Sequence, residues 1–143
     1  MPRPTKFRNV GFFPENTYFI PLGKPKCEIE EIVLKLEELE AMRLKDIKEL
    51  SQEECAERMK ISRQTFQNII DSARKKTAQA LTEGKAINIS GGNYTTAYCK
   101  FKCDNCGEIY PINYAQDRKA CPKCGSNKVF SSKKDDFCKK WCK

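Results

Sequence analysis

Residues 50–66 read LSQEECAERMKISRQTF and contain two helix starts separated by a short turn. Ser51 followed by Glu54 forms a capping-box pattern, in which the hydroxyl accepts an orphan backbone amide and the glutamate reaches back. Ser62 is of the residue type that caps a second helix. Lys60 and Ile61 remain for the turn between them. The stretch therefore predicts a short helix ending near residue 59, a tight turn and a longer helix starting at residue 62.

Apolar spacing on both sides of this stretch extends the prediction to three helices. Residues 36–83 contain neither proline nor glycine, and Gly84 follows as a stop signal. We expect helices over about 37–48, 51–59 and 62–82, with Leu44 off the apolar side of the first. The side chains predicted to face the interior are Leu36, Leu39, Met42, Ile47 and Leu50, then Cys55, Ala56 and Met59, then Phe66, Ile69, Ile70, Ala73, Thr77, Ala78 and Leu81.

A short helix, a turn and a longer helix form the helix-turn-helix pattern of many DNA-binding proteins. The predicted base contacts in the major groove are Arg63, Gln64, Gln67 and Asn68. Arg74 and Lys75, two turns further on, are expected at phosphates. Asp71 on the same side is expected to accept from cytosine or to orient Arg74 or Lys75. The alternative is an amphipathic three-helix bundle with an ordinary solvated face.

Charge along the chain is uneven. The 143 residues include 27 basic and 19 acidic side chains, for a net charge of +8. Residues 31–57 carry net −5, residues 58–90 net +5 and residues 91–143 net +6. This pattern favours a polyanion-binding face, although lysine-rich surfaces also serve solubility. Histidine is absent, and no phosphate-binding glycine loop is present, so the sequence does not indicate an enzyme.

The first 30 residues are predicted to form an extended arm, because prolines at positions 2, 4, 14, 21 and 25 prevent a long helix. Arg3, Lys6 and Arg8 lie in this arm and are expected at phosphates or in the minor groove, the alternative being a frayed terminus. Residues 86–90 alternate like a strand and precede two glycines, so we expect a hairpin with residues 93–101. The predicted domains are the arm at 1–30, the DNA-binding domain at 31–92 and a cysteine-rich module with a basic tail at 93–143.

Two Cys-x2-Cys pairs, 14 residues apart, predict a four-cysteine zinc site in the last module. The expected ligands are Cys103, Cys106, Cys121 and Cys124. Gly107 and Gly125 follow the two pairs and allow the chain to turn. Residues 108–110 and 128–130 read as short strands, so the module resembles a zinc ribbon. A closed site of this kind is structural, and zinc would supply folding energy. An iron site or an iron–sulfur cluster is the alternative.

The other five cysteines have less definite roles. Cys99, Cys138 and Cys142 are either spare thiols or a further metal or redox site, for which a fourth ligand is missing. Cys27 and Cys55 are expected to be structural. Trp141, among lysines, is expected to pack on the ribbon rather than to stack on a base.

Three segments, residues 40–46, 50–59 and 61–66, resemble DNA-binding region four of bacterial sigma factors. More closely, the chain from Arg3 to Tyr94 looks like domain-of-unknown-function family 134, whose members are small prokaryotic predicted DNA binders. The matching motifs are Arg3-Pro4-x-Lys6-x-Arg8, Ser62-Arg63-Gln64-Thr65-Phe66, Ala73-Arg74-Lys75-Lys76 and Gly91-Gly92-x-Tyr94. Two positions depart from the pattern: Lys60 stands where such turns place glycine, and Cys55 where alanine is usual.

Together these observations predict a mainly α fold: a sigma region-four-like, three-helix helix-turn-helix domain followed by a small β zinc-ribbon-like module. The expected function is transcriptional regulation through double-stranded DNA. The alternatives are a metal- or redox-responsive regulator using the surplus cysteines, and a module that docks on RNA polymerase or another protein. No apolar run reaches the ~18 residues of a membrane span, and no secretory signal is visible, so we expect a cytoplasmic protein. A homodimer is compatible with the sequence, because one helix-turn-helix reads few base pairs.

Overall fold

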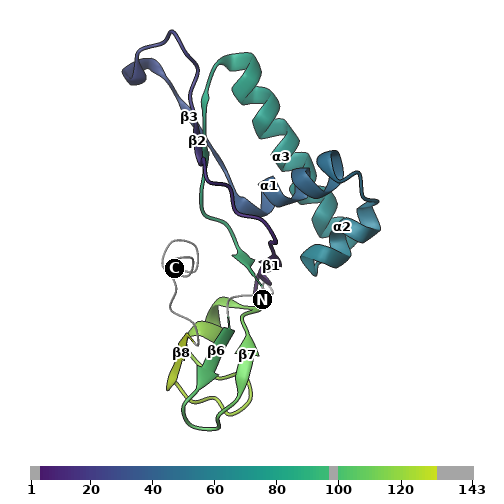
Figure 1. The fold of residues 1–143 in the computed structure, drawn as a ribbon, viewed down its shortest axis with the longest axis vertical. Coiled ribbons are helices and arrows are strands. Elements are labelled where there is room, and N and C mark those ends of the chain that lie inside the picture. Colours follow the sequence, from purple (N-terminus) through teal and green to yellow (C-terminus); the bar gives the residue numbers. More distant parts are fainter. Residues whose placement is uncertain (1–3, 97–99, 132–143) are drawn as a thin grey trace. The chain divides into compact units, whose positions relative to one another are not determined.

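The computed structural model describes residues 4–96 and 100–131 (Figure 1). Arg3, Cys99, Cys138, Trp141 and Cys142 therefore lie outside the described residues. The chain divides into two compact units. Residues 10–92 form one, called the helical unit below, and residues 1–9 together with 93–143 form the other, called the cysteine unit.

The three predicted helices are present in the helical unit. They are α1 (Leu36–Met42), continued by the π-helical turn η2 (Arg43–Ile47), α2 (Gln52–Met59) and α3 (Arg63–Glu83). The Ser51 hydroxyl accepts the backbone amide of Glu54 at 3.2 Å, and the Ser62 hydroxyl accepts that of Thr65 at 3.1 Å. Gly84 ends α3 with a φ of 66°. Both predicted serine caps and the glycine stop are confirmed.

Three residues, Lys60, Ile61 and Ser62, join α2 to α3. Lys60 caps the end of α2 in the left-handed conformation, with φ 57° and ψ 45°. The amide of Ile61 then donates to the carbonyl of Ala56 at 3.0 Å. A left-handed lysine costs about 1 kcal/mol relative to glycine. The bond from Ile61 to Ala56 and the Ser62 cap of α3 fix the turn in this conformation.

The core of the helical unit differs from the sequence prediction at the end of the first helix. Leu44 is only 2% exposed and belongs to the core, whereas Ile47 is 74% exposed, so the assignment of these two side chains was wrong. The amide of Lys48 bonds the carbonyl of Arg43, five residues back, which widens the turn. Leu44 lies three residues after buried Ala41 and so continues the buried side of α1. The π-helical turn rotates the side chains that follow, and this turns Ile47 outward.

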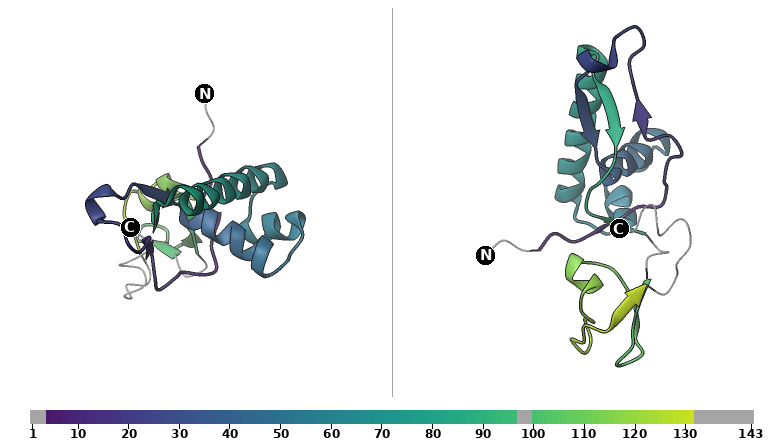
Figure 2. Two further views of the ribbon diagram at one scale, coloured as in Figure 1. Left: turned by 90° about the horizontal axis from the view of Figure 1, so that it is seen from above. Right: turned by 90° about the vertical axis from the view of Figure 1, so that its left-hand side faces the viewer.

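The last turns of α3 also differ. Ala80 is buried, whereas Ala78 is exposed and Leu81 is 77% exposed, so the last two positions of the predicted buried side were wrong. The first half of α3 packs on α1 and α2, and its second half runs along β3 (Glu31–Leu34) and β4 (Ala86–Ile89) (Figure 2). The two strands cover a narrower side of α3 than α1 and α2 do. Leu81 lies outside the side that the strands cover.

A three-stranded sheet covers part of α3. Its order is β2 (Tyr18–Phe19), β4, β3, and β4 runs antiparallel to β2 and parallel to β3. The predicted hairpin between residues 86–90 and 93–101 is therefore wrong. Short apolar strands do not specify their partners locally, and β4 pairs with β2 from the proline-containing segment and with β3 just after it instead. The 3-10 turn η1 (Lys26–Glu28) lies between those two strands.

The cysteine unit is built on a second sheet. Its order is β7 (Ile109–Pro111), β6 (Lys100–Cys103), β8 (Val129–Ser131), with both pairings antiparallel. The 3-10 turn η3 (Ala115–Arg118) follows β7, and Asp117 in it accepts the amides of Asn113 and Tyr114, both at 3.0 Å. The buried cluster consists of Phe7, Cys103, Tyr110, Ile112 and Cys121.

The start of the predicted arm belongs to this unit. β1 (Arg8–Asn9) pairs in parallel with β5 (Tyr94–Thr95), and the amide of Phe7 donates to the carbonyl of Asn113 at 2.6 Å. The guanidinium of Arg118 lies 5.3 Å from the centre of the Phe7 ring. Residues 7–9 are thus an integral part of a folded unit rather than an extended arm, because burial of Phe7 fixes them.

In the described residues the chain combines three α-helices with eight short strands, so a mainly α class is not confirmed. The fold contains both helices and strands, together with a cluster of four cysteines. Among the described residues, no helix has both the length and the apolar character that a membrane crossing requires.

Candidate DNA-recognition surface and metal centre

The polar side of α3 carries the predicted DNA contacts of this helix. Arg63, Gln64 and Asn68 are exposed on its first two turns, and Gln67 between them is half-buried. Arg74 and Lys75 are exposed two turns further along. The buried side chains Phe66, Ile69, Ile70 and Ala73 lie on the opposite side. The structure therefore brings all six predicted contacts to one solvent-facing side of one helix.

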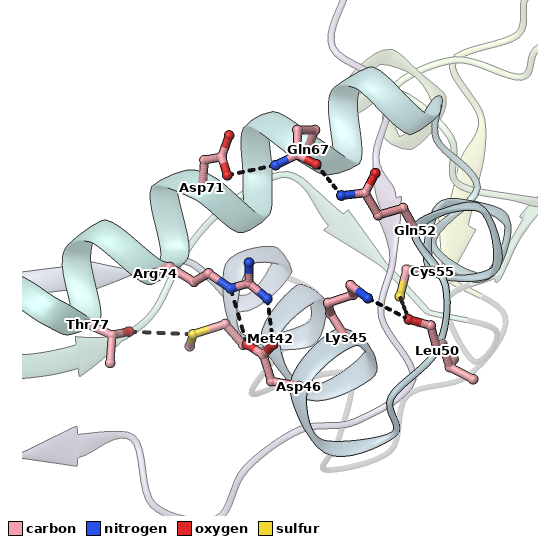
Figure 3. A network of polar contacts seen from close by, with 10 residues as sticks. All are labelled: Met42, Lys45, Asp46, Leu50, Gln52, Cys55, Gln67, Asp71, Arg74 and Thr77. Atoms are coloured by element: carbon pink, nitrogen blue, oxygen red, sulfur yellow. Dashed lines mark hydrogen bonds and ion pairs between the residues drawn. The ribbon is translucent and has the colours of Figure 1, made fainter.

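A chain of side-chain hydrogen bonds links the start of α2 to this surface (Figure 3). Arg63 Nε donates to Gln52 Oε1 at 3.1 Å, and Gln52 Nε2 donates to Gln67 Oε1. Gln67 Nε2 then donates to Asp71 Oδ1 at 2.8 Å. In both glutamine amides the oxygen accepts one hydrogen bond and the nitrogen donates another. The orientation of the Gln67 amide is therefore fixed. The sequence prediction missed Gln52, because its type and position at a helix start do not distinguish it from a solvated glutamine.

Asp71 and Arg74 each have a hydrogen-bond partner within the protein. Asp71 receives Gln67, while Arg74 Nη2 pairs with Asp46 Oδ1 of η2 at 2.6 Å (Figure 3). The hydrogen bond that Arg74 donates to Asp46 raises the pKa of Arg74, which is already cationic at neutral pH. The predicted phosphate contact of Arg74 would therefore share this guanidinium with Asp46. Lys75 has no hydrogen bond or ion pair to any residue within 4–96 or 100–131.

The exposed neighbours of Arg63 hold it weakly. Arg63 Nη1 lies 3.4 Å from Glu53 Oε1, and both side chains are about two-thirds exposed, so water screens the pair. Gln64 Nε2 donates to Asn68 Oδ1 at 3.1 Å, one turn along the helix. These contacts orient the side chains without burying them, and a ligand can replace them.

The N-terminal basic residues lie in the cysteine unit. Lys6 is exposed, and Arg8 is half-buried and donates from Nη1 to the carbonyl of Lys6 at 2.8 Å. They therefore belong to a different compact unit from α3. Arg3, the third predicted phosphate contact of the arm, lies outside the described residues.

The four predicted metal ligands converge. The sulfur atoms of Cys103, Cys106, Cys121 and Cys124 all lie within 4.8 Å of one another. The Cys103–Cys124 and Cys106–Cys121 separations are 3.6 and 3.7 Å. A tetrahedral zinc ion with bonds of ~2.3 Å would separate its sulfur ligands by about 3.8 Å. The cluster therefore has the size of a tetrahedral metal site.

Two similar turns position these sulfurs. The amide of Gly107 donates to the carbonyl of Cys103, and that of Gly125 to the carbonyl of Cys121, both at 2.9 Å. The two glycines have φ values of 75° and 77°, in the left-handed region. The predicted role of glycine after each cysteine pair is confirmed, because a side chain at either position would be strained.

The thiols of the cluster compete for protons. The backbone amide of Ser126 and the side chain of Asn105 lower the pKa of Cys124 to about 6. The backbone amide of Glu108 acts in the same direction on Cys106, but desolvation and the three neighbouring sulfurs outweigh it and raise that pKa to about 11. Four thiolates this close repel one another, so full ionisation of the cluster requires a bound cation.

Comparison with known proteins gives the family. Residues 1–97 match the model of a family described as "Protein of unknown function DUF134". The chain belongs to the DUF134 family. It is 76% identical over 143 residues to a UPF0251 protein of Clostridium botulinum (strain Loch Maree / Type A3), covering 100% of the chain and 91% of that relative. A UPF0251 protein of Clostridium beijerinckii is 73% identical, with 100% and 97% covered. No solved structure matches the chain.

The DUF134 match ends before the cysteine pairs, whereas the similarity to the UPF0251 relatives extends through them. The resemblance of residues 3–94 to this family is confirmed. Both units of the DUF134 chain therefore occur together in the relatives that it matches.

Some of the acidic side chains in residues 31–57 of the DUF134 chain are buried, which the sequence analysis did not predict. Glu38 is buried: its Oε1 accepts the amide of Lys35 at 3.0 Å and Nζ of Lys76 at 2.7 Å, and its Oε2 accepts the Ser72 hydroxyl at 2.6 Å. Desolvation raises the pKa of Glu38, but the hydrogen bonds from these three residues outweigh it and lower the value.

Glu40 is buried in the same helix turn. It accepts the amide of Gly11 and, through Oε1, Nε of Arg43 at 2.6 Å. These carboxylates hold α1 to neighbouring segments and do not form a solvent-facing acidic surface. The net charge of −5 counted along residues 31–57 therefore overstates the negative charge that a ligand meets.

Proposed function

We propose that this protein binds double-stranded DNA and regulates transcription, with α3 in the major groove. One observation carries the proposal. The short helix α2, the left-handed turn at Lys60 and the serine-capped start of α3 form a helix-turn-helix, and three polar side chains project from the first two turns of the second helix. This is the position from which such helices contact base edges.

The exposed side chains have the chemistry of base readers. Arg63 can donate two hydrogen bonds to guanine, and Gln64 and Asn68 can pair their amides with adenine. Gln67 is fixed by Gln52 and Asp71, so it acts on readout by holding the α2–α3 angle and by offering its remaining N–H. Lys75, which is exposed and unpaired among the described residues, is the stronger of the two phosphate contacts on α3.

The proposed metal is zinc, held by the four cysteines in a closed structural site of zinc-ribbon type. The sulfur separations of 3.6 and 3.7 Å support it, as do two knuckles that each supply one buried and one exposed cysteine. Thiolate ligands favour zinc or iron over hard cations. Zinc fits a site in which all four positions of a tetrahedron come from the protein.

The test of DNA binding uses matched substitutions on one helix. Genomic site selection on the zinc-loaded protein should shift its preferred sequence when Gln64 or Asn68 is changed to alanine. The variant Lys75→Ala should weaken binding to all duplexes together. Gln79→Ala, an exposed change further along the same helix, serves as the control. Equal behaviour of all four variants would refute the docking of α3.

A further inference from the structure

The sheet of the cysteine unit has two chemically different faces. Along β6, β7 and β8 burial alternates, and Phe101, Cys103, Tyr110 and Val129 point into the buried cluster. The alternate side chains are all exposed and form what we call the outer face: Lys100, Lys102, Ile109, Pro111 and Phe130. Ile109 is 56% exposed and Phe130 46% exposed. Large apolar side chains exposed together on one sheet face mark an interaction surface.

Strand register places these side chains side by side. Lys102 on the central strand pairs with Ile109 on one side and with Phe130 on the other, and Lys100 pairs with Pro111. Directly paired residues of antiparallel strands have Cβ atoms about 5 Å apart. Lys102 therefore leaves the sheet between two exposed apolar side chains.

The charge of the outer face is positive. It contains two lysines and no acidic residue. Beyond its metal-proximal end, the backbone pairing continues between Asp104 and Lys128, whose opposite charges offset each other. Lys102 has no ion pair with any residue in the described ranges.

A ligand that suits this surface must be both flat and apolar and also negatively charged. Single-stranded nucleic acid has this combination, because its unpaired bases stack on aromatic rings while its phosphates bind lysines. A duplex keeps its bases stacked inside and offers no ring to Phe130. We propose that the outer face binds single-stranded DNA or RNA, with a base stacked on Phe130 and a phosphate neutralised by Lys102. This site is separate from α3 and does not depend on duplex binding.

The test measures fluorescence anisotropy of a labelled oligothymidylate of about 12 nucleotides against the full-length, zinc-loaded protein over a salt series. Phe130→Ala should weaken binding about fivefold or more, as expected for loss of one stacked base. Lys102→Gln should weaken binding and reduce its salt dependence. Lys119→Gln makes the same charge change at an exposed position after η3, away from the outer face, and should change affinity less than about twofold.

Phe130→Trp guards against a folding artefact, because it keeps an aromatic surface and should bind at least as tightly as the parent. The proposal is overturned if the parent does not bind the oligonucleotide at low salt, if Phe130→Ala binds like the parent, or if Lys119→Gln weakens binding as much as Lys102→Gln. The double variant Arg63→Ala, Gln64→Ala separates the two proposals. It should lose duplex recognition and keep its affinity for the oligothymidylate.

Discussion

Replacing Glu38 with glutamine tests how much of the stability of the helical unit depends on one buried carboxylate. The carboxylate accepts hydrogen bonds from Lys35, Ser72 and Lys76, and the last is an ion pair at 2.7 Å between a buried and a mostly buried group. A hydrogen bond to a charged group contributes about 1.5–3 kcal/mol. Glutamine keeps one acceptor oxygen but leaves Lys76 without its counter-ion. We expect Glu38→Gln to lower the free energy of unfolding by about 2–3 kcal/mol at pH 7.

The effect should depend on pH in a defined direction. The pKa of Glu38 is lowered from its ordinary value of 4.5 in the folded protein. Its ionised form therefore stabilises the folded state fully above pH 4.5, and this stabilisation is lost as pH falls through the folded-state pKa. The difference between parent and Glu38→Gln should shrink as the pH falls below 4.5.

Urea unfolding followed by helical circular dichroism is the assay, because all three described α-helices lie in the helical unit and their signal reports on it. Glu31→Gln is the matched control: Glu31 is exposed on β3, and its loss should cost less than about 0.5 kcal/mol. A difference that stays constant between pH 7 and low pH, or a loss no larger than that of Glu31→Gln, would refute the assignment of Glu38 as a buried ionic anchor.

Three further predictions concern the turn, the surface and the metal. Lys60→Gly should raise the free energy of unfolding by about 0.5–1 kcal/mol in the same assay, because glycine adopts the left-handed conformation without strain. A loss of stability would contradict this. Glu49, with a φ of 56°, is in the same conformation, so Glu49→Gly should act in the same direction. Gln52→Ala should remove the hydrogen bond to Gln67 Oε1 and leave the bond from Gln67 to Asp71, so that sequence preference in site selection broadens with little change in helicity. An unchanged preference would count against the hydrogen-bond chain. Chelation of the metal, or Cys106→Ser, should abolish binding of one metal ion per chain. The amides of β6–β8 should then exchange with solvent, while those of the helical unit stay protected. If the amides of β6–β8 stay protected after both changes, the cysteine unit folds without metal.

The helices of this protein are predictable because their signals are local. Serine at positions 51 and 62 and glycine at 84 act on amides and carbonyls within one helical turn, and the structure places all three at helix ends. The cysteine cluster is predictable for the same reason, since each pair spans one tight turn. Four sulfurs at the expected positions then converge within 4.8 Å.

The parts that escaped prediction depend on distant or irregular structure. The π-helical turn that exposes Ile47 has no distinct sequence signal, and an ideal helical repeat misplaces this side chain. The pairing of β4 with β2 and β3, and of β1 with β5, joins segments far apart in the chain. The roles of Glu38 and Gln52 follow from partners on other elements, which residue type alone does not identify.

The most direct test of the central proposal is the anisotropy of a mixed-sequence duplex titrated with the reduced, zinc-loaded protein across a salt series. The helix-turn-helix account predicts that the logarithm of the association constant falls linearly with the logarithm of the salt concentration. The magnitude of this slope should be smaller by about one for Lys75→Ala than for the parent. No binding at low salt, or an unchanged slope and affinity in Lys75→Ala and Arg63→Ala, would contradict it. That result would assign the surface of α3 to a protein contact, with RNA polymerase as the first partner to test.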